Sequence, residues 1–242
     1  MDTKDAVYLD HNATTTVRSA AADAVARALV EGGNASSVHK FGRRARKLVE
    51  DSRDAVAALV AARPSGVVFT SGGSEANNLA LRGAGRARVL ASAVEHASVQ
   101  KAAPGIEAIP VDGSGVVDVA ALDEMLARDG RPAVVSVMLA NNETGVIQPV
   151  AEVAAVARRH GALVHCDAVQ AAGKMAVDAT ALGADMISLS AHKIGGPAGV
   201  GALVLARDVP LKAIVLGGGQ ERGRRAGTEN VPGIAGFGAA AR

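Results

Sequence analysis

A lysine, a carboxylate, a histidine and a glycine-opened helix follow separate apolar runs in this sequence. Lys193 comes after the strand-like run 185–189 and before a glycine-rich turn. A lysine that loses water has a depressed pKa, and its neutral amine can form a Schiff base with a carbonyl group. A surface lysine in a turn would show the same local pattern, so the interpretation of Lys193 depends on the other three segments.

Each of those segments has a chemical interpretation and a structural one. Gly73 and Ser74 open a predicted helix, whose free N–H groups and positive dipole end suit a phosphate, although an ordinary capped turn has the same sequence. His96 could stack on a flat ring or move protons, or be a structural histidine. Asp167 follows the strand 163–166 and could pair with a protonated ring nitrogen or cap the next helix.

Taken together, the four segments are more specific than any one of them. A phosphate cradle, a ring partner, an anionic partner for a pyridine nitrogen and a Schiff-base lysine are what pyridoxal 5′-phosphate (PLP) needs from a protein. Their placement at successive strand ends therefore predicts a PLP site.

Alternating strands and helices are expected to position these residues. Apolar strands are predicted at 67–69, 89–91, 106–111, 133–139, 163–166, 185–189 and 201–205. Helices are predicted at 18–31, 41–62, 74–81, near 96, at 119–127, 150–160 and 231–242. This order indicates an α/β fold with a mostly parallel sheet covered on both faces. Ligands of such sheets bind at the carboxyl ends of the strands.

The composition gives no support for a nucleic-acid-binding, membrane-spanning or secreted protein. The chain has 242 residues, 49% of them hydrophobic and 2% aromatic, so the core is built from small aliphatic side chains. A net charge of +2 gives no argument for nucleic acid, and the basic run Arg43, Arg44, Arg46 and Lys47 is interpreted as a solvated helix face because acidic residues follow it. No run is long enough to span a membrane, and the polar amino terminus does not resemble a signal peptide. One cysteine fits a reducing compartment, so we expect a cytoplasmic protein.

The sequence resembles the cysteine desulfurases, which belong to class V of the PLP-dependent aminotransferases of fold type I. The matching segments run in the family's order along nearly the whole chain. They are 8–15 (YLDHNATT), 34–39 (NASSVH), 70–78 (TSGGSEANN), Glu95-His96, 141–145 (NNETG), 165–168 (HCDA) with Gln170, 190–193 (SAHK) and 217–228 (GGGQERGRRAGT).

The resemblance implies catalytic roles for individual residues. Lys193 would bind the cofactor aldehyde and move the substrate's α-proton. Asp167 would keep the pyridine nitrogen protonated, and Gln170 would hydrogen-bond the phenolic oxygen of the ring. His96 would stack on the ring and shuttle protons, and Asn142 would lie near the substrate.

The resemblance also implies a phosphate site, a partner subunit and a domain division. The phosphate ligands would be Gly73, Ser74, Ser190, His192 and, from the other subunit of a homodimer, Thr228. Residues 1–15 would lie on the side of a small domain. Residues 16–242 would form the three-layer, PLP-binding large domain, with the carboxyl-terminal small domain missing.

The implied reaction converts L-cysteine to L-alanine and passes sulfur, as a persulfide, toward iron–sulfur clusters or thiolated cofactors through an acceptor or scaffold protein. The family's nucleophilic cysteine lies on a loop beyond residue 242. Cys166 is interpreted instead as a buried filler, and His165-Cys166 lacks the further ligands that a metal site requires. Two alternatives remain: another class V enzyme such as a selenocysteine lyase, or a non-catalytic PLP-binding remnant.

Overall fold

The computed structural model describes residues 7–242, so the first six residues of the predicted segment 1–15 lie outside the described residues. Seven strands in the described residues form one sheet in the order β1-β7-β6-β5-β4-β2-β3. The strands are β1 (Val67–Thr70), β2 (Arg88–Ser92), β3 (Glu107–Ile109), β4 (Ala133–Ser136), β5 (Leu163–Asp167), β6 (Met186–Ser190) and β7 (Gly201–Leu205). Strand β7 is antiparallel to both of its neighbours, whereas the pairs from β6 to β3 are parallel. The carboxyl ends of the other six strands therefore meet at one edge of the sheet.

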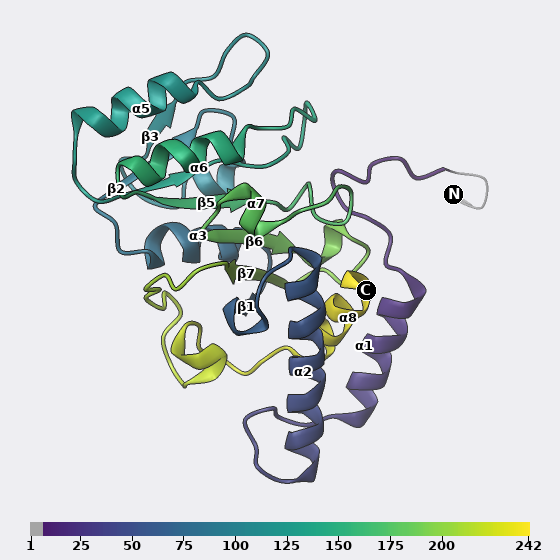
Figure 1. Ribbon diagram of the computed structural model, residues 1–242. Coiled ribbons are helices and arrows are strands. Elements are labelled where there is room, and N and C mark those ends of the chain that lie inside the picture. Colours follow the sequence, from purple (N-terminus) through teal and green to yellow (C-terminus); the bar gives the residue numbers. More distant parts are fainter. Residues whose placement is uncertain (1–6) are drawn as a thin grey trace.

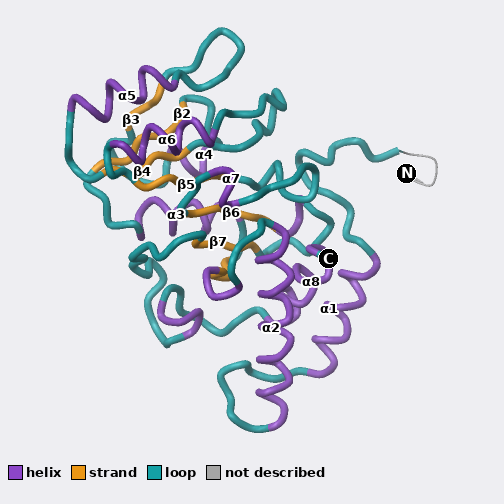
Figure 2. The backbone as a smooth tube through the Cα atoms, in the orientation of Figure 1, coloured by secondary structure: helices purple, strands orange, loops and turns teal. Residues whose placement is uncertain are grey.

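The strands alternate with helices (Figures 1 and 2). The α-helices are α1 (Ser19–Glu31), α2 (Lys40–Leu59), α3 (Gly73–Gly83), α4 (Ala97–Gln100), α5 (Val119–Arg128), α6 (Val150–Arg159), α7 (Ala179–Leu182) and α8 (Val231–Ala241). Short 3₁₀ turns cover Pro64–Gly66, Ala191–Lys193 and Gln220–Gly223. The predicted fold is confirmed: a mostly parallel sheet lies between two helical layers.

Alternate residues of each strand enter two separate cores. Val68 and Met186 pack with Leu79 of α3 on one face of the sheet. Val67 and Ile187, each next to a residue of the first core, belong to the core of the opposite face. Helices α1, α2 and α8 pack together in that second layer, which also holds α5 and α6. Side chains alternate across a strand, so apolar residues at nearly every strand position require helices on both faces, as the sequence predicted.

Several predicted elements are shorter in the structure, among them the strand expected over 106–111, which spans Glu107–Ile109 as β3. The helix expected near His96 is one turn long, and Pro104 and Gly105 follow closely after it. Proline disfavours a helical conformation in the residue before it, so a longer helix cannot form here. The strand expected over 133–139 ends as β4 at Ser136, yet the N–H groups of Val137 and Leu139 still donate to carbonyls of the β5 residues His165 and Asp167. The pairing thus continues irregularly toward the edge of the sheet.

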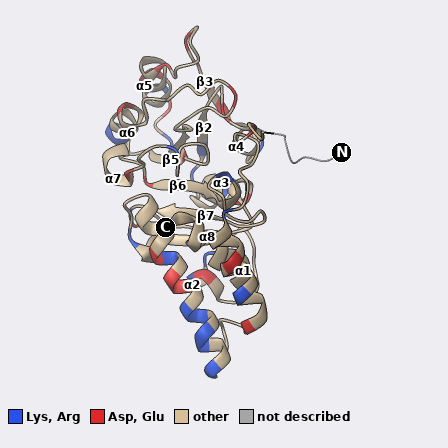
Figure 3. Cartoon of the chain, turned by 90° about the vertical axis from the view of Figure 1, so that its right-hand side faces the viewer, with Lys and Arg blue, Asp and Glu red and all other residues tan. Residues whose placement is uncertain are grey.

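Charged residues lie along much of α2, with basic residues at its lower end (Figure 3). Lys47 pairs with Asp51 one turn later at 2.9 Å, and Arg46 pairs with Glu229 at 3.0 Å. The exposed pair of Lys47 and Asp51 fits the interpretation of the basic run as a solvated helix face, whereas Arg46 contacts a buried carboxylate. Within residues 7–242, no helix combines the length and the apolar character needed to cross a membrane.

Candidate active site

A cavity of about 370 Å³ opens where the carboxyl ends of the strands meet. It brings together nine of the ten residues predicted for the site, from segments more than a hundred residues apart. They are Gly73, Ser74, His96, Asn142, Asp167, Gln170, Ser190, His192 and Lys193. The sequence-based expectation that the motifs converge at this edge is confirmed, whereas the role of each residue remains a proposal.

Asp167 ends β5 and lies at the bottom of the cavity, with 6% of its surface exposed. Its Oδ1 accepts a hydrogen bond from the Val169 N–H at 3.0 Å, and its Oδ2 accepts one from Asn77 Nδ2 at 2.7 Å. Burial raises the pKa of the carboxyl group, although these two hydrogen bonds oppose the shift. No salt bridge in the described part of the chain involves Asp167, so its buried carboxylate can accept a cationic ligand group.

A second carboxyl group, Glu95, is buried behind this site. Its Oε1 accepts the Met138 N–H at 2.6 Å, and its Oε2 has no hydrogen-bond partner among the described residues. Burial raises its pKa well above the usual value, and the charge of Asp167 adds to the shift. The shift favours the neutral form of Glu95, and of the two carboxyl groups Asp167 is the one that lines the cavity.

The amino end of α3 forms one wall. No side chain caps it, so its first N–H groups point out of the helix without a side-chain acceptor. A Cβ atom at Gly73 would lie 2.9 Å from a methyl of Val169, so glycine permits the close approach of α3 to the turn that follows β5. Ser74 and Ser190 face the same space. Free N–H groups, hydroxyls and a positive dipole end suit a phosphate.

His96 is the N-cap of α4 and lines the cavity. Its Nδ1 accepts the Ser98 N–H at 3.1 Å, so the neutral ring carries its proton on Nε2. His192 contacts the Thr14 hydroxyl through Nδ1 at 3.1 Å. Burial lowers the pKa of His192, and the charge of Lys193 lowers it further.

Lys193 is half-buried in the 3₁₀ turn that follows β6. Its ammonium group donates to the backbone carbonyls of Asn12 and Ala13, so the amino-terminal segment lies against the cavity. Burial lowers the pKa of Lys193, and the nearby charge of Lys174 acts in the same direction. A lowered pKa increases the fraction of neutral amine, which is the nucleophilic form.

Three contributors went unnoticed at the sequence level. Asn77 holds Asp167, Asn12 accepts from Lys193, and Lys174 donates to Gln170 at 2.7 Å. Asn77 lies about one helical turn after Gly73, and that spacing is the one signal that could have placed it at the cavity. Asn12 contacts Gln170 and Lys174 across 158 and 162 positions, which local patterns do not reveal, whereas Lys174 lies four residues after Gln170.

Thr228, the tenth predicted residue, does not line this cavity. It is exposed beside a smaller cavity of about 160 Å³ with Glu221 and Arg225.

Cys166 is fully buried in the core between the sheet and the layer that contains α1, α2 and α8, and burial raises its pKa well above the usual value. The prediction that Cys166 is an unreactive filler is confirmed in its geometry. Its neighbour His165 hydrogen-bonds the hydroxyls of Ser136 and Ser188, each at 2.9 Å.

Residues 7–242 match the family described as aminotransferase class-V, and the chain belongs to that family. Within it, the chain is 46% identical to a cysteine desulfurase of Cereibacter sphaeroides over 250 residues, and 40% identical to cysteine desulfurase IscS of Dictyoglomus turgidum over 251 residues. These matches cover 97% and 98% of the chain but 64% and 63% of the relatives. The chain thus spans less than two thirds of their length.

Solved structures of related proteins are also similar to this chain over nearly its whole length. A NifS-like protein from Rickettsia africae is 38% identical, with a TM-score of 0.93, and the match covers 97% of this chain and 68% of the other. A protein described as SspA in complex with cysteine is 32% identical, with a TM-score of 0.90, and is covered to 72%. The expected resemblance to cysteine desulfurases of fold type I is confirmed.

Proposed function

We propose that this chain binds PLP and performs the PLP-dependent part of a cysteine desulfurase reaction. The observation that carries the proposal is the convergence of Lys193, the buried Asp167 carboxylate and the uncapped end of α3 on one cavity. PLP has an aldehyde, a basic ring nitrogen and a phosphate, and each of these groups finds a complementary protein group here. The bound cofactor withdraws electrons from the α-carbon of an amino acid.

The protein's own groups have separate tasks in this proposal. Lys193 holds the cofactor aldehyde and moves the α-proton of the substrate. Asp167 balances the positive charge of the ring nitrogen, and Gln170 donates to the phenolic oxygen. His96 covers the ring and shuttles protons, while Asn142 lies beside the amino acid. Gly73, Ser74, Ser190 and His192 hold the phosphate.

The proposed substrate is L-cysteine, in line with the relatives' names and the cysteine bound to SspA. The Cβ–S bond of L-cysteine breaks, Cβ gains a proton, and the sulfur joins an acceptor thiol, which gives L-alanine and a persulfide. Cys166, the chain's one cysteine, is fully buried and cannot be that acceptor. The acceptor thiol therefore lies outside residues 1–242, and a sulfur-accepting or scaffold protein would take the persulfide sulfur onward.

The proposal also includes the domain division and the cellular location expected from the sequence. Residues 7–15, with Asn12 and Ala13 at the cavity, would lie on the side facing a small domain, and residues 16–242 would be the large domain. A cytoplasmic location is proposed because Cys166 is a free thiol, as expected in a reducing compartment.

The assignment of Lys193 is tested by reduction. Borohydride added to the PLP-loaded chain fixes the cofactor on the lysine that holds it, and peptide mass spectrometry identifies that lysine. We expect one stoichiometric label on Lys193, and none on Lys174, because Lys193 lines the cavity and Lys174 does not. A label on another lysine, or no label in a folded protein that retains PLP, would contradict the assignment. Release of L-alanine from L-cysteine in the presence of an added thiol then separates a desulfurase from a PLP-binding protein without activity.

A homodimer would explain the position of Thr228, whose exposed side chain lies outside its own chain's cavity. We expect Thr228→Ala and Lys193→Ala chains each to lose most borohydride-fixed cofactor when prepared alone. After the two are mixed, unfolded and refolded together, heterodimers contain one cavity with both residues intact, so part of the label should return. Loss without any recovery would show that each site is built within one chain.

A further inference from the structure

Two lysine ammonium groups contact the same asparagine at the edge of the cavity. Lys193 donates to the backbone carbonyl of Asn12, and Lys174 donates to the Asn12 side-chain Oδ1 at 3.1 Å. Lys174 also donates to Gln170 Oε1 at 2.7 Å. Lys174 is not among the residues that line the cavity, so it acts on the site through Asn12, Gln170 and its charge.

Lys174 determines which atoms the two amides turn toward the site. An ammonium group can only donate hydrogen bonds, so it selects the oxygen of each amide that it contacts. The Gln170 oxygen is thereby turned toward Lys174, which leaves the Nε2 group to donate to the Asn12 carbonyl at 2.8 Å. In the same way, Asn12 turns its Nδ2 group to the Asn142 carbonyl at 3.3 Å. Gln170 can therefore present donors, and not an acceptor, to a ligand.

The positive charge of Lys174 also acts on its neighbour. The pKa of Lys193 is lowered by burial first and by Lys174 second, whereas Asp10 and Asp167 raise it. His192 precedes Lys193 and His96 lines the same cavity; neither adds a negative charge. Lys174 thus opposes the two carboxylates that favour the ammonium form of Lys193.

We propose that Lys174 is a positioning residue that turns the Gln170 amide donor toward the cavity and places a second positive charge beside Lys193. This inference rests on the proposed function, in which Lys193 must be a neutral amine to react with the cofactor and Gln170 donates to its phenolic oxygen. It assigns a task to a residue outside the cavity lining and outside the motifs that identified the site.

The charge effect is measured without cofactor, so that it is independent of activity. The full chain is labelled with a trace of acetic anhydride at several pH values, and the Lys193 peptide is quantified by mass spectrometry. In Lys174→Met the like charge is gone, the ammonium form of Lys193 becomes easier to keep, and its pKa rises. We expect Lys193 labelling at pH 8 to fall about threefold. Lys174→Arg keeps the charge and the donors and should label as the parent does.

A matched control removes the same charge elsewhere. Lys212 lies beside Gly83 at the far end of α3, roughly 16 Å from the cavity at the rise of an α-helix. Lys212→Met should leave Lys193 labelling unchanged. Unaltered labelling in Lys174→Met, or an equal fall in Lys174→Arg, would overturn the charge effect. Borohydride mapping of Lys193 is a separate measurement, so failure of the proposed function would not be mistaken for failure of this inference.

The orientation of Gln170 needs its own readout. A PLP analogue that lacks the aldehyde cannot react with Lys193, so its affinity reports hydrogen bonds and charge pairing alone. In Lys174→Met the Gln170 amide loses one of its two anchors and keeps the contact of Nε2 with the Asn12 carbonyl, and we expect about fivefold weaker binding, the equivalent of one hydrogen bond. Lys174→Arg should restore the affinity. Equal affinity in parent and Lys174→Met would overturn the positioning of Gln170, and a melting temperature measured for each variant identifies any variant that fails to fold.

Discussion

Replacing Asp167 by asparagine is expected to slow exchange of the substrate α-proton by a factor between about one hundred and several thousand. The buried carboxylate is the one anion that the cavity offers to a protonated ring nitrogen, and an amide cannot balance that charge. Removal of one partner of a buried charge pair typically costs about 3–5 kcal/mol, and about 1.36 kcal/mol corresponds to tenfold in rate. Exchange of the α-proton in deuterium oxide, followed by NMR in the PLP-loaded chain, measures the effect without a sulfur acceptor.

The Asp167→Asn variant leaves the local hydrogen bonds largely intact. The introduced amide oxygen can still accept the Val169 N–H, and the introduced amide nitrogen can donate to Asn77 Oδ1, which has no partner among residues 7–242 of the parent. This needs one rotation of the Asn77 amide. Asp185→Asn is a matched control, because Asp185 is also buried and accepts the Val164 N–H at 2.8 Å, but at the opposite edge of the sheet. Exchange should remain at the parental rate in that control; an equal loss in both would show that Asp167 acts through stability.

In the cofactor-free protein, by contrast, the Asp167→Asn substitution should not lower the stability of the folded state. Burial raises the pKa of Asp167 in the folded state above its value in the unfolded chain. Ionisation of the raised group therefore costs stability as the pH rises above its unfolded pKa. At neutral pH, asparagine removes that cost, so Asp167→Asn should unfold no more easily than the parent without PLP. A lower melting temperature in cofactor-free Asp167→Asn would contradict this account.

Local patterns were enough to predict the sheet and most of the cavity. Strand ends carry Asp167 and Lys193, and parallel strands bring such ends to one edge whatever the loops do. The resemblance to the family then named Gln170 and Asn142. Neither route found Lys174: it lies four residues after Gln170, outside the matching segments, and its other partner, Asn12, is 162 positions away. The assignment of Thr228 to a second subunit came from the family alone, and it stays a prediction.

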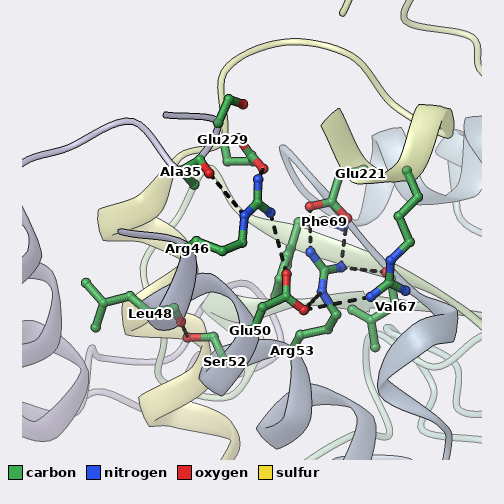
Figure 4. A network of polar contacts seen from close by, with 12 residues as sticks. Ala35, Arg46, Leu48, Glu50, Ser52, Arg53, Val67, Phe69, Glu221 and Glu229 are labelled. Atoms are coloured by element: carbon green, nitrogen blue, oxygen red, sulfur yellow. Dashed lines mark hydrogen bonds and ion pairs between the residues drawn. The ribbon is translucent and has the colours of Figure 1, made fainter. Parts of the chain in front are cut away.

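A buried ion pair that the sequence did not predict fixes the loop leading to Thr228 (Figure 4). Arg53 of α2 donates to both carboxylate oxygens of Glu221, at 2.8 and 3.0 Å, and to the Val67 carbonyl at 2.7 Å. Glu221 Oε2 also accepts the Phe69 N–H at 3.0 Å. Both charged residues are nearly inaccessible, so every donor and acceptor must be satisfied inside the protein.

The ion pair also stabilises an unfavourable backbone conformation at Glu221 and Arg222. Glu221 and Arg222 have φ angles of 46° and 58°, in the left-handed region that non-glycine residues avoid. Such conformations cost about 1–3 kcal/mol each and persist only where surrounding contacts impose them. A second ion pair, from Arg225 to Glu75 at 2.8 Å, ties the same loop to the first turn of α3. The loop is thus fixed on α2 and on the helix that forms the proposed phosphate site.

Glu221→Gln is therefore expected to lower the free energy of unfolding by about 3–5 kcal/mol, measured by urea denaturation. The variant leaves Arg53 buried with the partly exposed Glu50 as its remaining anionic partner, at 3.1 Å. Lys47→Met is the control, because it breaks the exposed pair with Asp51 on the same helix, and such pairs contribute about 0.2–1 kcal/mol.

The double variant Arg53→Met/Glu221→Gln separates the ion pair from its surroundings. If Glu221→Gln is unstable because the buried Arg53 cation lacks a partner, removing that cation should restore part of the free energy of unfolding. The double variant should then be more stable than Glu221→Gln. Recovery will be incomplete, because Arg53 also covers the Phe69 ring at 4.9 Å and the left-handed backbone at Glu221 remains. Additive losses would mean that Glu221 stabilises the loop mainly through contacts other than the one with Arg53. A Glu221→Gln variant within about 1 kcal/mol of the parent, the range of an exposed pair, would contradict the anchoring role of the buried pair.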